Sequence, residues 1–221
     1  MMENQIQLSH VLYRVKDLHA SVKKLQDAGF IVEYGTKHEK AYNAIIWFEE
    51  GVFIEIYSSS ELPTIAKWLF KIIGYQSVLD RLNKWSKIEN GWCEWSLEST
   101  VANLNELKSV FKEVEIPFKS QKTKRKDANG QILRWELVMP KDIEFPFLMS
   151  AYTPNPRPKN IEHPNGVSKV STLVVGKEKL NVKLLNHLLT DVSDLKLVDG
   201  KSGLQDVILD VDTIKIKEIL K

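Results

Sequence analysis

The sequence predicts an α+β protein in which paired βαβββ modules form a cup-shaped mixed sheet. One succession of strand, helix and further strands occurs in residues 8–57, returns in residues 91–152, and reappears in weaker form after residue 166. The 221 residues are 43% hydrophobic and 27% charged, a balance typical of globular proteins and enough for a substantial core. We therefore expect five segments: a first module at 1–60, a helical linker at 61–90, a second module at 91–152, a proline-rich strap at 153–166 and a third, smaller βαβββ-like C-terminal piece at 167–221.

The first module shows the pattern most clearly. Its expected elements are a strand, a helix and three strands: Leu8 to Val15, Leu18 to Ala28, Phe30 to Tyr34, Asn43 to Phe48 and Val52 to Tyr57. Asp17 is placed to cap the helix, and Gly29 stands where a left-handed residue ends one. Glu49 to Gly51 is short enough for a hairpin connection between the last two strands.

The linker carries two helical patterns that Gly74 separates. Apolar residues at helical spacing mark the two helices: Ile65, Trp68, Leu69, Ile72 and Ile73 for one, and Val78, Leu79 and Leu82 for the other. Periodicity favours a linker that packs its apolar side onto the cup, and the functional alternative is a lid over a site. The later segment Pro154 to Pro158 is restricted to extended or turn conformations, which suits a connecting strap.

The second module repeats the order. Trp92 to Leu97 predicts a strand, and Asn103 caps a helix with Glu106 at the third position. The buried stripe of that helix is expected to be Leu104, Leu107, Val110, Phe111 and Val114, with Pro117 beyond its end. Ile132 to Met139 and Phe145 to Tyr152 supply two strands, and the basic run Lys122 to Lys126 is interpreted as a solvated hairpin tip beside the turn at 127–130.

The C-terminal piece repeats the order only weakly. Val167 to Val175 predicts a strand and Leu180 to Leu189 a helix. Short strands are expected after it, at Leu195 to Val198, Leu204 to Val211 and Ile214 to Ile219.

Charge and composition exclude several classes of function. The net charge is +2 and basic residues are interspersed with acidic ones, which argues against nucleic acid as a partner. No apolar stretch approaches the roughly 20 residues that span a bilayer, and the N-terminus lacks the pattern of a signal peptide. With a single cysteine, Cys93, the chain suits a reducing compartment, so we expect a cytoplasmic protein. No glycine-rich phosphate loop is present, so no nucleotide cofactor is expected.

Strand alternation locates the candidate chemistry. The residue set Leu8, His10 and Leu12 faces one way on the first strand, and Phe53, Glu55 and Tyr57 share a side of the fourth. The opposite sides are aliphatic and suit packing beneath the helix, which leaves His10 and Glu55 on the concave side. Burial of an unpaired carboxylate is costly, so Glu55 needs a metal, a histidine or a polar ligand. The loop before the third strand should bring His38 and Asn43 to the mouth of the cavity, and a plain hydrogen-bonded core pair of His10 and Glu55 is the alternative.

Several motifs together resemble a known family. They are His10 on the first strand, Gly35-Thr36-Lys37-His38, Asn43 to Ile46, Glu55 on the fourth strand, Pro154 to Pro158, and His163-Pro164-Asn165-Gly166. In this arrangement the chain resembles the glyoxalase-like branch of the vicinal-oxygen-chelate superfamily over roughly residues 6–175. The resemblance implies a cup of paired βαβββ modules, often with a divalent metal held by the first and last strands of each module, which here makes His10 and Glu55 the metal ligands.

The second module departs from that pattern. Alignment of the strands places Trp92 near the position of His10 and Met149 near that of Glu55, and neither is a usual ligand of a catalytic divalent ion. Glu94 has the same strand parity as Trp92 and offers a carboxylate. Trp92, Glu94 and Trp135, with His38 and Asn43, are the candidate substrate-binding residues, although large aromatic residues are more often part of a core.

Two functions remain open at this point. In the first, a divalent metal on His10 and Glu55 assists a lyase, isomerase or dioxygenase reaction in which Glu55 is catalytic. In the second, the cup binds or sequesters a small molecule without metal or turnover. Both have a small-molecule ligand and no membrane as partner, and a homodimer is compatible with either.

Overall fold

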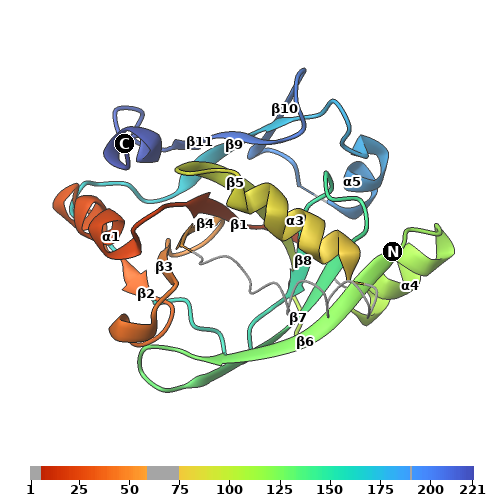
Figure 1. Ribbon diagram of the computed structural model, residues 1–221, viewed down its shortest axis with the longest axis horizontal. Coiled ribbons are helices and arrows are strands. Elements are labelled where there is room, and N and C mark those ends of the chain that lie inside the picture. Colours follow the sequence, from red (N-terminus) through yellow and green to blue (C-terminus); the bar gives the residue numbers. More distant parts are fainter. Residues whose placement is uncertain (1–5, 59–74, 190) are drawn as a thin grey trace.

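The computed structural model describes residues 6–58, 75–189 and 191–221 (Figure 1). An eight-stranded sheet curls into a half-barrel, and a three-stranded sheet lies beside it (Figure 1). Within the described ranges, no helix is long and apolar enough to cross a membrane. The expected helix around Ile65 to Ile73 lies outside the described residues, whereas the second helix of the linker is present as α3 (Gln76–Ser86).

The large sheet consists of two modules with the same order of elements. The first contains β1 (Ile6–Arg14), α1 (Leu18–Asp27), β2 (Glu33–Tyr34), the short 3-10 helix η1 (His38–Lys40), β3 (Asn43–Ile46) and β4 (Phe53–Tyr57). The second contains β5 (Gly91–Ser99), α4 (Asn105–Glu113), β6 (Phe118–Lys126), β7 (Ile132–Pro140) and β8 (Phe147–Ser150). The strand order β2-β3-β4-β1-β5-β8-β7-β6 is symmetric about its centre, where β1 and β5 run antiparallel. The expected pair of βαβββ modules is therefore confirmed.

The convex face of the sheet holds the main core. Asp17 caps α1 by accepting a hydrogen bond of 3.0 Å from the amide of Ala20, and the helix buries Leu18, Val22 and Leu25. The alternate residues of β1 and β4 pack beneath it in the same cluster: Val11, Tyr13, Val15, Val52, Ile54 and Ile56. Because this apolar set faces the helix, His10 and Glu55 are left to the concave face.

Three details of the second module differ from the expectation. The basic run Lys122 to Lys126 is the end of strand β6, not a hairpin tip, and the turn covers only the residues after it. The helix α4 begins one residue later than expected; Asn103 accepts a hydrogen bond from the amide of Asn105 from just outside it. Val114 is 49% exposed because the helix ends at Glu113 and the chain turns away there.

The C-terminal piece folds as a βαββ unit with a final helix. It contains β9 (Val170–Gly176), α5 (Val182–Leu188), β10 (Leu195–Val198), β11 (Gly203–Leu209) and α6 (Ile216–Ile219). The last element is a short helix and not the strand expected at Ile214 to Ile219, and its buried residue is Ile216. The strand β11 lies against β5, and the unit shares the convex core cluster (Figure 1). The third unit therefore covers the outside of the half-barrel.

Candidate functional site

His10 and Glu55 meet on the concave face. The strands β1 and β4 pair in parallel, with His10 opposite Phe53 and Leu12 opposite Glu55. This register brings His10 Nε2 within 3.8 Å of Glu55 Oε2. The histidine side chain is 5% exposed and the carboxylate side chain 17% exposed. Glu55 is therefore the member of the pair that a ligand in the cup can reach.

The imidazole of His10 is enclosed by two phenylalanines and two serines. Phe53 stacks on it with ring centroids 4.6 Å apart, and Phe147 meets it edge-on at 5.5 Å. The Oγ atoms of Ser96 and Ser9 lie 2.7 Å and 2.9 Å from His10 Nδ1. Burial lowers the pKa of His10 to about 3, so the ring is neutral at physiological pH.

The carboxyl group of Glu55 is held by Asn43. The Nδ2 atom of Asn43 donates a hydrogen bond of 2.9 Å to Glu55 Oε1. Burial raises the pKa of Glu55, and Asn43 and Arg125 act against that rise. The other end of the Asn43 amide lies against Gly35, where an added Cβ would come within 2.1 Å of Oδ1, so a side chain at this glycine would displace the amide. Asn43 thus belongs to the site, as a partner of Glu55.

Arg125 belongs to the same group, although its place there was not predicted from the sequence. Its guanidinium donates to the carbonyl oxygen of Gly35, just after β2, and to the hydroxyl of Tyr152. Since β6 and β2 are the two edge strands of the sheet, this contact joins the edges of the curled sheet. The signal was available: in an alternating strand Arg125 faces the opposite side from Lys124 and Lys126, which are both exposed.

The strand registers identify the counterparts of His10 and Glu55 in the second module. His10 lies opposite Phe53 in the β1–β4 pair, and Ser96 lies opposite Phe147 in the β5–β8 pair. Two residues further along β8, Met149 corresponds to Glu55, as expected. The counterpart of His10 is therefore Ser96 and not Trp92.

A bulge explains why Trp92 was misplaced. Between β1 and β5 the register shifts so that Cys93 has no opposite residue, and the alternation of β5 changes there. Trp92 consequently faces the convex core, where its ring meets Tyr13 edge-on at 4.8 Å. Trp92 therefore does not line the cup, and the expectation that it binds a substrate there is wrong.

The donor set does not fit a chelated divalent ion. Of the four corresponding positions, only His10 and Glu55 carry usual ligands; the others carry the Ser96 hydroxyl and the Met149 thioether. The Ser96 hydroxyl already contacts His10 Nδ1. Within the part of the chain that the structure describes, no group of three histidine, cysteine or acidic side chains could hold an ion.

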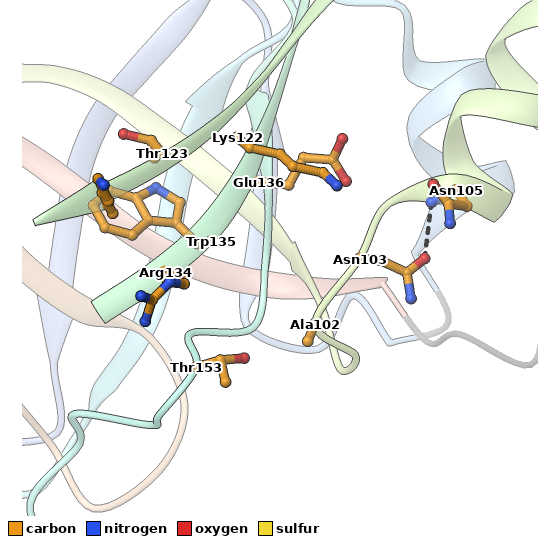
Figure 2. Close-up of a pocket in the computed structure, with 10 residues that line it drawn as sticks. Ala102, Asn103, Asn105, Lys122, Thr123, Arg134, Trp135, Glu136 and Thr153 are labelled. Atoms are coloured by element: carbon orange, nitrogen blue, oxygen red, sulfur yellow. Dashed lines mark hydrogen bonds between the residues drawn. The ribbon is translucent and has the colours of Figure 1, made fainter. Parts of the chain in front are cut away.

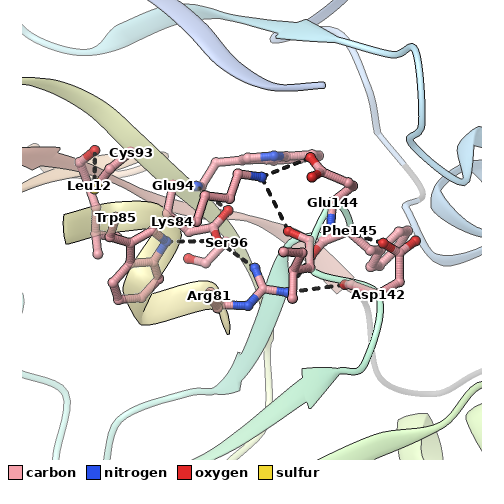
Figure 3. A network of polar contacts seen from close by, with 12 residues as sticks. Leu12, Arg81, Lys84, Trp85, Cys93, Glu94, Ser96, Asp142, Glu144 and Phe145 are labelled. Carbon is pink, nitrogen blue, oxygen red and sulfur yellow. Dashed lines mark hydrogen bonds and ion pairs between the residues drawn. The ribbon is translucent and has the colours of Figure 1, made fainter. Parts of the chain in front are cut away.

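Glu94 is committed to an ion pair. Its Oε2 atom pairs with the guanidinium of Arg81 on α3 and accepts a hydrogen bond of 3.2 Å from Trp85 Nε1 (Figure 3). Arg81 also donates to the carbonyl oxygens of Phe145 at 2.7 Å and Asp142 at 3.2 Å (Figure 3). Both charged side chains are buried. This carboxylate anchors α3 and is not available to a ligand.

The two remaining candidates lie apart from the pair. The exposed His38 sits on η1, where its ring lies 4.3 Å from that of His19 on α1 and meets Tyr34 of β2 edge-on at 4.8 Å. Trp135 packs against Tyr152, with ring centroids 5.0 Å apart. It also borders a shallow cavity of about 490 Å³ beside Arg134 and Lys122 (Figure 2). Tyr152 links Trp135 to Arg125, so Trp135 borders the cup while His38 does not.

A second cavity opens at one end of the half-barrel. We call it the end cavity; its volume is about 530 Å³, within the range of small-molecule sites. Its lining includes Phe53 and Tyr152 from the cup, Arg157 from the strap, Lys169 from the C-terminal unit, and Glu98 at the end of β5. His163 of the strap is structural: its Nδ1 accepts from the amide of Ile31 at 3.0 Å, and its Nε2 lies 3.0 Å from the carbonyl oxygen of Trp47.

Comparison with solved structures shows which folds resemble this one. A hypothetical protein from Staphylococcus aureus matches with a TM-score of 0.65 at 14% identity, over 92% of this chain and 90% of that one. The Mn(II)-bound glyoxalase from Novosphingobium aromaticivorans matches with a TM-score of 0.53 at 12% identity, over 98% and 69%. An extradiol ring-cleaving dioxygenase from B. fuscum matches with a TM-score of 0.52 at 11% identity, over 93% and 57%. At these identities the likeness establishes the fold alone.

Sequence comparison is more specific about the family. No curated protein matches the chain. The family model described as a glyoxalase-like domain matches residues 8–189, which is most of the sequence and includes both modules. The chain therefore belongs to the glyoxalase-like domain family, within the vicinal-oxygen-chelate superfamily.

Proposed function

We propose that the protein binds a small, planar molecule in the cup, at Glu55, and does so without a bound divalent ion. The observation that carries the proposal is the setting of Glu55: a partly exposed carboxyl group on a concave, largely apolar face, with Asn43 and Arg125 beside it. Ligand sites of this kind combine apolar walls with a few polar groups that fix orientation. The carboxyl group would accept hydrogen bonds from a ligand, and Arg125 would donate them.

The residues of this chain support ligand binding that does not depend on a metal. The glyoxalase that resembles it in fold is Mn(II)-bound, but a fold does not select a cofactor. Ser96 and Met149 stand where two further ligands would be needed. A chelated ion held by His10 and Glu55 alone would bind weakly, because water would have to supply most of its coordination.

Proton transfer to or from the bound molecule is a second candidate function, and the pKa of Glu55 favours it. Burial raises that pKa, which moves the carboxyl group toward the neutral range where a general acid or base works best. Glu55 would then exchange a proton with the ligand, as in isomerases. His10, neutral and buried, would support the carboxyl group from behind.

Fragment binding tests the proposal. We would screen planar aromatic fragments that carry hydroxyl groups by saturation-transfer NMR, in parallel with Glu55→Gln and with the exposed control Glu50→Gln. We expect fragments to bind the wild-type protein and the control at millimolar concentration, with binding lost in Glu55→Gln and unchanged by a chelator. Equal binding to all three proteins, or loss of binding on addition of the chelator, would contradict it.

A further inference from the structure

Ser9 and His10 point to the same face of the sheet, although they are consecutive in a strand. Leu8 lies opposite Leu97 and Val11 opposite Trp95, so β1 carries one extra residue between these pairs. A bulge of this kind re-aims a side chain. Regular alternation would place Ser9 on the opposite face from His10; instead its Oγ lies 2.9 Å from His10 Nδ1.

Ser9 connects His10 to the end cavity. Its hydroxyl donates a hydrogen bond of 3.1 Å to Glu98 Oε2, and Glu98 lines that cavity. The other oxygen of Glu98 accepts a hydrogen bond of 2.8 Å from Gln7. Ser9 is completely buried and His10 nearly so. A continuous series of polar atoms therefore runs along the concave face, from the end cavity to His10.

We propose that Glu98, Ser9 and His10 form a proton path between the end cavity and the carboxyl group of Glu55. The path rests on the proposed function, because it supplies the proton that Glu55 would exchange with a ligand. The path gives a role to the end cavity, which Phe53 and Glu98 both line.

The transfer balances in protons and charge. A proton from water in the end cavity binds the Glu98 carboxylate, which then donates to Ser9 Oγ instead of accepting from it. The Ser9 hydroxyl turns to His10 Nδ1, gives its own proton to that nitrogen and takes up the proton from Glu98. The ring then releases the proton on Nε2 to Glu55 Oε2. One proton leaves the solvent and one carboxylate of the cup becomes protonated; Glu98 and Ser9 return to their starting states, and His10 ends as the other neutral tautomer.

The last step needs a small movement. The distance of 3.8 Å between His10 Nε2 and Glu55 Oε2 exceeds a hydrogen bond, so the atoms must approach by about 1 Å before the proton transfers. The Glu55 side chain is partly exposed and can make this approach, whereas the His10 ring is fixed by its stack on Phe53.

Ser96 provides a matched control. Its hydroxyl lies 2.7 Å from the same nitrogen, His10 Nδ1, and it is as fully buried as Ser9. Of the two serines, Ser9 is the one that donates to Glu98. Removal of either hydroxyl removes one contact from the imidazole, but only the change at Ser9 interrupts the path.

The experiment measures how fast the imidazole proton of His10 exchanges with water. Protein labelled with ¹⁵N at histidine would be studied by NMR without any ligand, with His10→Gln to assign the signal. We expect Ser9→Ala and Glu98→Gln each to slow the exchange at least about tenfold, and Ser96→Ala to change it less than about twofold. Glu98→Gln keeps the shape of the side chain and removes the group that takes up the proton.

Two outcomes would overturn the path. Exchange as fast in Ser9→Ala and Glu98→Gln as in the wild type would mean that water reaches His10 from the cup. An equal slowing in Ser96→Ala would mean that packing around the ring controls exchange. Because no ligand is present, these results are independent of the fragment screen: fragments that fail to bind would refute the binding function while leaving the exchange rates to decide the path.

Discussion

The two modules share a backbone plan but differ in what they place on the concave face. In each, the first strand pairs in parallel with the last, and a phenylalanine lies opposite the key position of the first strand. The first module puts His10 and Glu55 there, and the second puts Ser96 and Met149. The two modules therefore share the curvature of the sheet, whereas at these positions the imidazole and the carboxylate belong to the first module. Symmetry of fold is no guide to symmetry of site.

The buried carboxylates of the two modules show the same difference. Glu94 in the second module is neutralised by Arg81 and further bound by Trp85. Glu55 in the first module accepts from the neutral amide of Asn43, and Arg125 acts on it through its charge. A neutralised carboxylate stabilises a structure, whereas a carboxyl group with a raised pKa is held at a cost and is available for chemistry.

The largest expected effect is the creation of a metal site by restoring the symmetry. Ser96→His with Met149→Glu would add two strong ligands opposite His10 and Glu55, completing four positions. We expect the wild-type protein to bind no Co²⁺ at millimolar concentration, and the double variant to bind it at least about a thousandfold more tightly. The visible absorption of Co²⁺ and calorimetry would measure this.

A third substitution controls for adventitious binding. Glu55→Gln in the double variant leaves both new ligands in place and removes one native ligand, so Co²⁺ affinity should fall by at least about tenfold. Unchanged affinity would show that the ion sits elsewhere. Tight binding of one Co²⁺ by the wild-type protein would refute our interpretation of Ser96 and Met149.

The next effect in size is the loss of the buried ion pair. Glu94→Gln leaves Arg81 as an uncompensated buried charge, which typically costs about 3 to 5 kcal/mol. We expect a decrease of that size in the free energy of unfolding, measured by denaturant titration at pH 7. Fragment binding in the cup should persist under conditions where the variant is folded. A decrease below about 1 kcal/mol would mean that the pair contributes little.

The matching change in the first module should have the opposite sign. The pKa of Glu55 is raised in the folded protein, so its ionisation opposes folding as the pH rises, and below the unfolded pKa the group is protonated in both states. Glu55→Gln should therefore stabilise the fold at pH 8 by about 1 kcal/mol, the scale of single side-chain changes.

The same pair of proteins at pH 4 provides the control. The difference between Glu55→Gln and the wild type should fall there to about a few tenths of a kcal/mol, because pH 4 lies just below the ordinary pKa of a glutamate and most of the carboxyl groups are protonated in both states. As the pH falls from the pKa of His10 in the unfolded state toward about 3, protonation of His10 in the unfolded state lowers the stability of the fold. This loss should be equal in the two proteins. Destabilisation by Glu55→Gln at pH 8 would indicate a purely structural pair.

The sequence predicted the first module better than the second, for physical reasons. From His10 to Leu12 the strand β1 alternates regularly, as β4 does around Glu55, so their meeting could be predicted from parity, whereas the bulge that turns Leu8 to the convex core could not. In the second module a bulge at Cys93 reverses which residues of β5 face the cup, and a bulge in a mostly apolar strand gives no recognisable pattern in the sequence. The strand β6 was missed because most of its residues are exposed and polar, so it lacks the apolar alternation that marks a half-buried strand.

An effect of similar size concerns Arg125, which joins the two modules at the edges of the sheet. Arg125→Ala removes the hydrogen bond to Gly35 and the contact with Tyr152, and should lower the free energy of unfolding by about 1 to 2 kcal/mol. Lys124→Ala, one residue away on the exposed side of β6, should leave it unchanged, because its side chain points to solvent.

A third variant, Arg125→Lys, separates two roles of Arg125. If Arg125 only closes the sheet, Arg125→Ala should leave fragment binding intact, and Arg125→Lys should not restore stability, because an ammonium group cannot reproduce the fork of a guanidinium. If its positive charge beside Glu55 also orients the ligand, Arg125→Lys should restore part of the fragment binding that Arg125→Ala loses, while stability stays low. The second result is the one we expect, since the charge of Arg125 acts on Glu55 whereas its hydrogen bonds go to Gly35 and Tyr152. Equal binding by wild type and Arg125→Ala would confine Arg125 to holding the modules together.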